Sequence, residues 1–129
     1  MKRLFLAAAA LMIVLPASAE ALKTSRVIKE MKQACVAEMK AHKQPRSGPY
    51  CSCVSKAANK WVGEAEDEKE TQIRLWSLKN DLLPEDTTDE QLFARTSEAG
   101  IEDNEMTGAL ILNFYAIEDF YTDCAPKAE

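Results

Sequence analysis

The sequence predicts an all-α fold, a small antiparallel bundle of about five helices cross-linked by two disulfides. Three observations lead to this prediction. Apolar residues recur at three- and four-residue steps along the chain, and no alternating strand pattern competes with them. The N-terminus has the features of an export signal, and the chain that follows it contains four cysteines, an even number.

Residues 1–19 resemble a cleaved bacterial-type Sec signal peptide. They begin with the basic "MKR", continue with the apolar "LFLAAAALMIVL" and end with Ala17 and Ala19 in a small-x-small pattern. The apolar run is shorter than the roughly 20 residues that a membrane span needs, although a retained anchor is the alternative interpretation. We expect cleavage after Ala19, release into the periplasm or the medium, and no stable membrane anchor afterwards.

Residues 20–129 form a single domain by length. Loss of Lys2 and Arg3 with the signal would change the formal net charge from -5 to -7, two charges lower, because residues 1–19 contain no acid. An acidic surface repels phosphate groups, so nucleic acid and anionic lipid are poor candidate partners. The one cluster of positive charge, "KAHKQPR" at residues 40–46, is interpreted as a solvated loop between helices.

The first two helices follow from an apolar stripe and a group of chain breakers. Between Ser25 and His42 the stripe consists of Ile28, Met31, Cys35, Met39 and His42. Pro45, Gly48 and Pro49 interrupt the chain, and Pro49 suits the first turn of the next helix. That second helix has one broad apolar face made of Val54, Ala57, Ala58, Trp61, Val62 and Ala65.

The third and fourth helices are marked by their ends. The acidic run at residues 64–70 predicts a solvated turn or a charged first turn, after which Ile73, Trp76 and Leu83 suggest a helix stopped by Pro84. In the fourth helix, Thr88 and Gln91 have the spacing of a capping box just before two apolar residues, and Gly100 supplies a stop.

The last helix is predicted to open near Asp103 and to run for nearly five turns. Its stripe consists of Met106, Leu110, Phe114, Ile117, Tyr121 and Cys124. Gly108 weakens this helix by about 1 kcal/mol relative to alanine without overturning the prediction.

The four cysteines are interpreted as disulfide partners, since oxidation is the default for an exported protein. Cys35 and Cys124 lie on the stripes of the first and last helices, whereas Cys51 and Cys53 sit at the start of the second helix. Two bridges from this point would tie the first and last helices to the second one. In the loop-entropy model they would contribute roughly 3 to 4.5 kcal/mol each.

The pairing is less determined than the presence of the bridges. A Cys51–Cys53 ring would be strained. Depth along the hairpin favours Cys35–Cys53 with Cys51–Cys124, whereas helical phase favours Cys51 for the core. We prefer the pairing that depth suggests and leave the exchanged pairing, Cys35–Cys51 with Cys53–Cys124, open.

Two chemical functions compete with the interpretation as a scaffold. Cys51-x-Cys53, with Cys35, Met39 or His42 nearby, could serve as a soft ligand set for copper or zinc, or as a thiol-handling site. However, the spacing matches no zinc signature, and His42 is the only histidine. We therefore predict no metal and no cofactor.

A helical hydrolase with paired carboxylates is the third hypothesis. Glu118 and Asp119, next to apolar neighbours, are its best local candidates, although a solvated helix edge explains them more simply. No nucleophile turn, phosphate loop or calcium loop is present in the sequence. No catalytic residue is therefore assigned, and we expect a protein that is not an enzyme.

The leading hypothesis is a periplasmic protein-binding module, with an inhibitor, immunity, accessory or chaperone-like role and another protein as its partner. Adjacent aromatic residues on the last helix diverge, so at least one of them should be exposed. Tyr115, Tyr121 and Trp76 are the candidates for an interaction surface.

Overall fold

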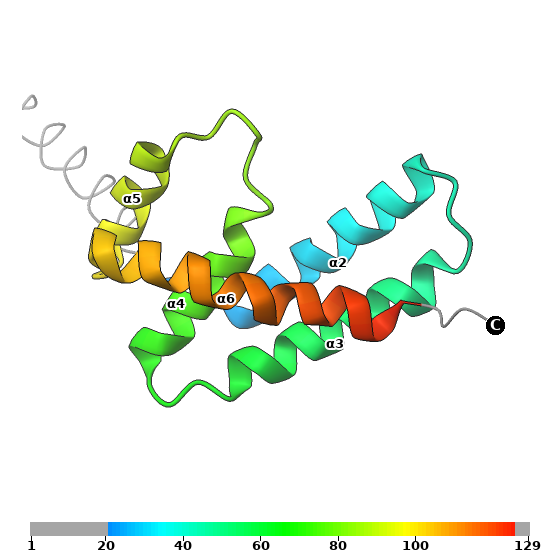
Figure 1. The fold of residues 1–129 in the computed structure, drawn as a ribbon, viewed down its shortest axis with the longest axis horizontal. Helices are drawn as coiled ribbons and strands as arrows, with labels where there is room; N and C mark the ends of the chain where they lie inside the picture. The colour runs from blue at the N-terminus through cyan, green and yellow to red at the C-terminus, as the bar shows by residue number, and fades with distance from the viewer. Residues whose placement is uncertain (1–20, 126–129) are drawn as a thin grey trace, which may run out of the picture.

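The computed structural model describes residues 21–125, which form five helices and no strand (Figure 1). The helices are α2 (Thr24–Ala41), α3 (Ser47–Gly63), α4 (Glu68–Asn80), α5 (Asp89–Glu98) and α6 (Asp103–Cys124). The predicted all-α bundle of five helices with two disulfides is confirmed. The signal peptide predicted for residues 1–19 lies outside the described residues.

Helices α2 and α3 form one hairpin, α4 packs beside it, and the long α6 runs across α3 and α4 (Figure 1). α5 lies at the end of the molecule where α6 begins. Because α6 spans from α5 to the α2–α3 connection, it contacts both halves of the fold. One side of α6 is therefore packed against the rest of the bundle.

The starts of α4 and α5 are fixed by local hydrogen bonds, of which the sequence predicted those at α5. The Thr88 hydroxyl accepts from the Gln91 backbone N–H at 3.2 Å, and the Gln91 side chain accepts from the Thr88 N–H at 2.9 Å, which confirms the predicted capping box. α4 begins with Asp67, whose carboxylate accepts from the Glu70 N–H at 2.7 Å. The acidic run is thus part turn and part first helical turn.

The C-terminal end of α5 agrees with the prediction from the sequence, whereas that of α4 comes earlier than predicted. Gly100 follows α5 with a φ of 85°, a left-handed conformation that favours glycine. α4 ends at Asn80, three residues before the predicted Leu83. The ring of Pro84 disfavours helical geometry at the residue before it, so the chain leaves the helix over Asp81–Leu83.

The core consists of two clusters joined by α4. The larger cluster contains Val27, Met31, Val54, Ala58, Val62, Leu75, Leu78 and Phe120. The smaller cluster contains Trp76, Leu92, Ile101 and Met106. Since Leu75 and Leu78 face one cluster and Trp76 the other, α4 is buried on two sides. This explains why its sequence shows little periodicity.

Each disulfide has one of its cysteines near the start of α3. The pairing that we preferred from the sequence is wrong. Cys35 bonds to Cys51, and Cys53 bonds to Cys124, with Cα separations of 5.7 and 5.8 Å. Cys51 is fully buried at 0% exposure, so it faces α2 within the hairpin. Helical phase, and not depth along the hairpin, decides which cysteine meets which helix.

Selective reduction tests this pairing and the difference in burial. Cys53 is exposed, whereas Cys35 and Cys51 are buried, so a limiting phosphine reductant should open Cys53–Cys124 first. Alkylation under native conditions followed by peptide mapping should label Cys53 and Cys124 before the other two. Early labelling of Cys35 together with Cys53 would contradict both the pairing and its explanation.

Candidate functional site

The large apolar side chains that are exposed in residues 21–125 all lie within five consecutive positions of α6. Ile111, Leu112, Phe114 and Tyr115 are 63, 75, 54 and 70% exposed, and we call these four residues the α6 outer face. Single exposed apolar residues are ordinary on a protein surface, whereas large contiguous apolar patches are typical of interaction sites. The rings of Phe114 and Tyr115 also contact each other edge to face, with centroids 5.5 Å apart.

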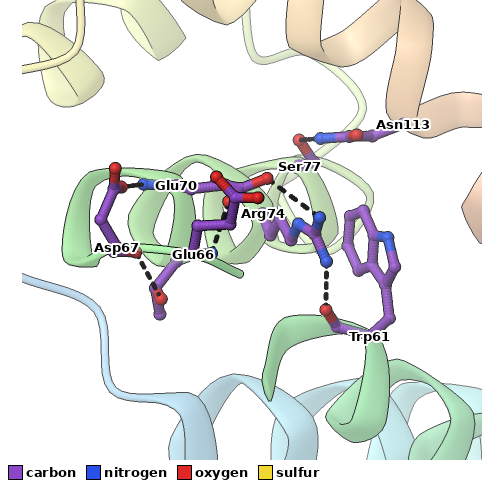
Figure 2. A network of polar contacts seen from close by, with 8 residues as sticks. Trp61, Glu66, Asp67, Glu70, Arg74, Ser77 and Asn113 are labelled. Atoms are coloured by element: carbon purple, nitrogen blue, oxygen red, sulfur yellow. Dashed lines mark hydrogen bonds and ion pairs between the residues drawn. The ribbon is translucent and has the colours of Figure 1, made fainter. Parts of the chain in front are cut away.

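One inward-facing side chain explains why these residues point outward. Asn113 donates a hydrogen bond from Nδ2 to the Ser77 hydroxyl of α4 at 3.0 Å (Figure 2), and Ser77 is 2% exposed. A helix advances about 100° per residue. With Asn113 turned towards α4, its nearest neighbours lie on the two flanks of α6, and Ile111 and Tyr115 lie on the far side.

A polar network in the first half of α4 holds this helix in place beneath the Asn113–Ser77 hydrogen bond. Arg74 donates to the carbonyl of Trp61 and to the Glu70 carboxylate, the latter at 3.0 Å (Figure 2). Its guanidinium also lies 5.0 Å from the centre of the Trp61 ring. The network joins the end of α3 to α4, so the surface on which α6 rests is itself fixed.

The surroundings of the α6 outer face are acidic. α6 contains Asp103, Glu105, Glu118, Asp119 and Asp123 and no lysine or arginine. One of these acids is paired, since Lys69 lies 2.7 Å from Glu105. The face is therefore an apolar patch with negative charge towards both ends of its helix.

Gly108 lies one turn before the outer face on the same helix. A Cβ atom built at this position would meet no atom within 4 Å, so packing within the described structure does not require glycine here. Its absence of a side chain leaves the helix backbone open next to Ile111 and Leu112.

A groove of about 350 Å³ between α4 and α6 borders the outer face at Phe114. Tyr121 and Asp81 line it, and both also line an adjoining groove of about 450 Å³ with Tyr50 and Glu38. The rings of Tyr50 and Tyr121 are 6.5 Å apart. The predicted surface residue Tyr121 is thus half-buried beside the α6 outer face.

Burial in these grooves changes the acidity of three groups. Asp81 is exposed by area, but the surrounding groove displaces part of its water, and this desolvation raises the pKa of its carboxyl. Burial raises the pKa of Tyr121, with further increases from the negative charges of Asp81 and Glu38 and from Tyr50. Burial and then Glu38 raise the pKa of Tyr50 in the same way.

The structure separates the three aromatic residues proposed for an interaction surface. Tyr115 is exposed on the α6 outer face, and Tyr121 lines the adjoining groove. Trp76 was wrongly predicted to be at the surface, because it is 5% exposed and packs in the smaller core cluster. Phe114, which we assigned to the apolar stripe of the last helix, is instead exposed, since Asn113 takes the inward position beside it.

Of the residues of the two chemical hypotheses, Cys35, Met39 and His42 line the groove of about 450 Å³, whereas Glu118 lines the groove of about 350 Å³ without Asp119. All four cysteines are in disulfides, so neither Cys51 nor Cys53 offers a thiolate in this state. Between residues 21 and 125, no group of three or more His, Cys, Asp or Glu side chains is placed to hold a metal ion. Glu118 and Asp119 are exposed on α6, as is His42 at the end of α2.

No protein-family model, curated protein sequence or solved structure matches the chain. None of the helices from α2 to α6 has the length and apolar character needed to cross a membrane. The two disulfides indicate an oxidising compartment outside the cytoplasm.

Replacing Asp81 by asparagine should stabilise the protein slightly at neutral pH. The raised pKa means that the folded state binds the proton more tightly, so the free energy of unfolding falls as pH rises from the ordinary aspartate pKa, about 3.9, through the raised one. Asp81 also caps the C-terminal end of α4, where the helix dipole disfavours a negative charge.

Urea unfolding of Asp81→Asn and wild type at pH 7 and pH 3 measures this effect. The variant should be more stable at pH 7 and equal to the wild type at pH 3. The matched control is Asp86→Asn, an exposed position in the same loop, which should change stability less at pH 7. A gain of equal size at both pH values would contradict the electrostatic explanation.

Proposed function

We propose that the protein is an exported, non-enzymatic module that binds another protein through the α6 outer face. It acts in the bacterial periplasm or outside the cell, after cleavage of the signal behind Ala19. The observation that carries this proposal is the concentration of Ile111, Leu112, Phe114 and Tyr115 at exposed positions of one helix. The oxidising compartment indicated by the disulfides and the signal-like N-terminal sequence support the location.

The chemistry of the face specifies the kind of partner. Aromatic and branched apolar side chains at the centre require an apolar patch on the partner, which supplies most of the affinity. The acids at the two ends of α6, together with its lack of lysine and arginine, favour a basic rim around that patch. The proposed partner is therefore a protein that has an apolar surface bordered by lysine and arginine.

The scaffold favours binding because it holds the face in one orientation. Asn113 fixes the rotation of α6 against α4, and Cys124 fixes its end against α3. A surface that is already ordered loses less conformational entropy when it binds. The soft-metal and hydrolase alternatives gain no comparable observation.

A paired comparison of variants tests the binding proposal. Leu112→Ser with Tyr115→Ser removes the centre of the face at exposed positions, so the fold should keep its thermal midpoint within a few degrees. The double variant should lose at least tenfold in affinity for a periplasmic partner isolated on the wild-type protein, chiefly through faster dissociation. Lys29→Ser with Lys60→Ser, at exposed positions of α2 and α3, is the control and should retain binding.

The acidic ends require a second measurement on the same complex. Glu118→Gln with Asp119→Asn should slow association and reduce its dependence on salt, while dissociation changes little. The proposal is contradicted if the wild type captures no protein, or if the double serine variant captures every protein that the wild type captures. Self-association that this variant abolishes would show that a second copy of the chain covers the face, which would contradict binding to a different protein.

A further inference from the structure

A cavity of about 340 Å³ lies between the start of α2 and the helices α4 and α5, away from the α6 outer face. Six charged side chains line it, four basic and two acidic: Lys23, Arg26, Lys79, Arg95, Glu30 and Glu98. The cavity therefore has an excess of two positive charges, in a chain whose formal net charge is -5. Basic residues from three separate elements converge here against the overall charge of the protein.

Three of the four cations at the cavity are not engaged in an ion pair with a carboxylate. Lys79 pairs with Glu30 at 2.8 Å, which accounts for one cation and one acid. Among the described residues, no ion pair engages Lys23, Arg26 or Arg95. Two guanidinium groups, from α2 and α5, thus remain available at the same cavity.

The beginning of α2 adds further hydrogen-bond donors at this cavity. The N-cap residue is Lys23, which has no side-chain oxygen to accept from the first N–H groups, and the first turn contains no acid. Lys23, Arg26 and Val27 from this turn line the cavity. An uncapped helix start of this kind, with the positive end of the helix dipole, favours an anion.

An independent observation comes from Trp76 in the wall of the cavity. Its indole Nε1 is the single buried side-chain nitrogen or oxygen in the described part of the chain that has no hydrogen-bond partner. Trp76 is 5% exposed, so water does not readily supply the acceptor. Buried donors are rarely left unsatisfied, so a shift of the cavity wall that let a bound acceptor reach this nitrogen would gain a hydrogen bond.

The cavity wall is held in place before any ligand binds. Leu22 forms two hydrogen bonds with one buried side chain, since its N–H donates to Gln72 Oε1 at 3.0 Å and its carbonyl accepts from Gln72 Nε2 at 2.9 Å. This pairing fixes the chain that leads into α2 against α4. Leu22, Val27 and Trp76 add an apolar surface beside the cations.

We propose that this cavity binds a small organic oxyanion, a carboxylate or phosphate group attached to a compact apolar body. Arg26 and Arg95 pair with the oxyanion, Trp76 Nε1–H donates to it, and the apolar wall contacts the rest of the ligand. A volume of about 340 Å³ lies at the lower end of the range for small-molecule sites. The site is independent of the protein-binding function proposed for α6.

The indole N–H of Trp76 is a direct reporter for the test. The chain contains two tryptophans, so Trp61→Phe assigns the two indole cross-peaks in a ¹⁵N–¹H correlation spectrum. Inorganic phosphate, phenyl phosphate, succinate and benzoate are titrated at low ionic strength, with potassium chloride at matched ionic strength as the salt control. At least one oxyanion should move the Trp76 cross-peak downfield with saturation, whereas chloride should not.

Two charge variants and a matched control make the test specific. Arg26→Gln and Arg95→Gln should each weaken binding about tenfold, as expected for the loss of one charge-assisted hydrogen bond. Lys29→Gln removes the same charge from an exposed position of α2 outside the cavity and should bind within about twofold of wild type. Thermal midpoints without ligand verify that all three variants fold.

The four anions distinguish the chemistry of the ligand. Tighter binding of phosphate and phenyl phosphate would assign a phosphate group, and tighter binding of succinate and benzoate a carboxylate. A Trp76 cross-peak that no oxyanion moves, or that chloride moves equally, would overturn the proposal. Unchanged affinity in both arginine variants would overturn it as well.

Discussion

The rest of the structure depends on two disulfides whose α3 cysteines lie within one turn of that helix. Cys51 and Cys53 are two positions apart on α3, which places their side chains about 200° apart around the helix axis. One sulfur therefore points into the hairpin and bonds to α2, and the other points outward and bonds to the end of α6. A single turn of α3 thus joins the first and last helices of the described chain.

This junction determines which side chains of α6 are exposed to solvent. Its end is held by Cys124, its middle by the hydrogen bond from Asn113 to Ser77, and its beginning by the burial of Met106. With three points fixed along its length, α6 has little freedom to rotate and bury its apolar residues. The exposure of Ile111, Leu112, Phe114 and Tyr115 is a consequence of how the helix is anchored.

The features that the sequence predicted are local ones. The capping box at Thr88, the glycine stop at Gly100 and the bounds of α6 depend on residues within a few positions of each other. The disulfide pairing failed because it depends on the relative rotation of α2 and α3, which hairpin depth does not reveal. Trp76 was misplaced because α4 is buried on two sides, and the short stripe of Ile73, Trp76 and Leu83 did not show which side faces solvent.

The two candidate sites also differ in whether the sequence alone could reveal them. Tyr115 was identified because adjacent residues on a helix diverge, an argument that needs no tertiary structure. The cationic cavity was not predicted, since Arg26, Lys79 and Arg95 are far apart in sequence and each resembles an ordinary solvated charge. Only the folded arrangement of α2, α4 and α5 brings them to one place.

Hydrogen exchange on a variant lacking Cys53–Cys124 tests the central claim most directly. With both cysteines replaced by alanine, the account predicts faster exchange over the last turns of α6 and retained protection in the α2–α3 hairpin, which Cys35–Cys51 still closes. Unchanged protection of α6 would contradict the claim that this bridge anchors it. Equal loss of protection in the hairpin would contradict the claim that the two bridges act on separate helices.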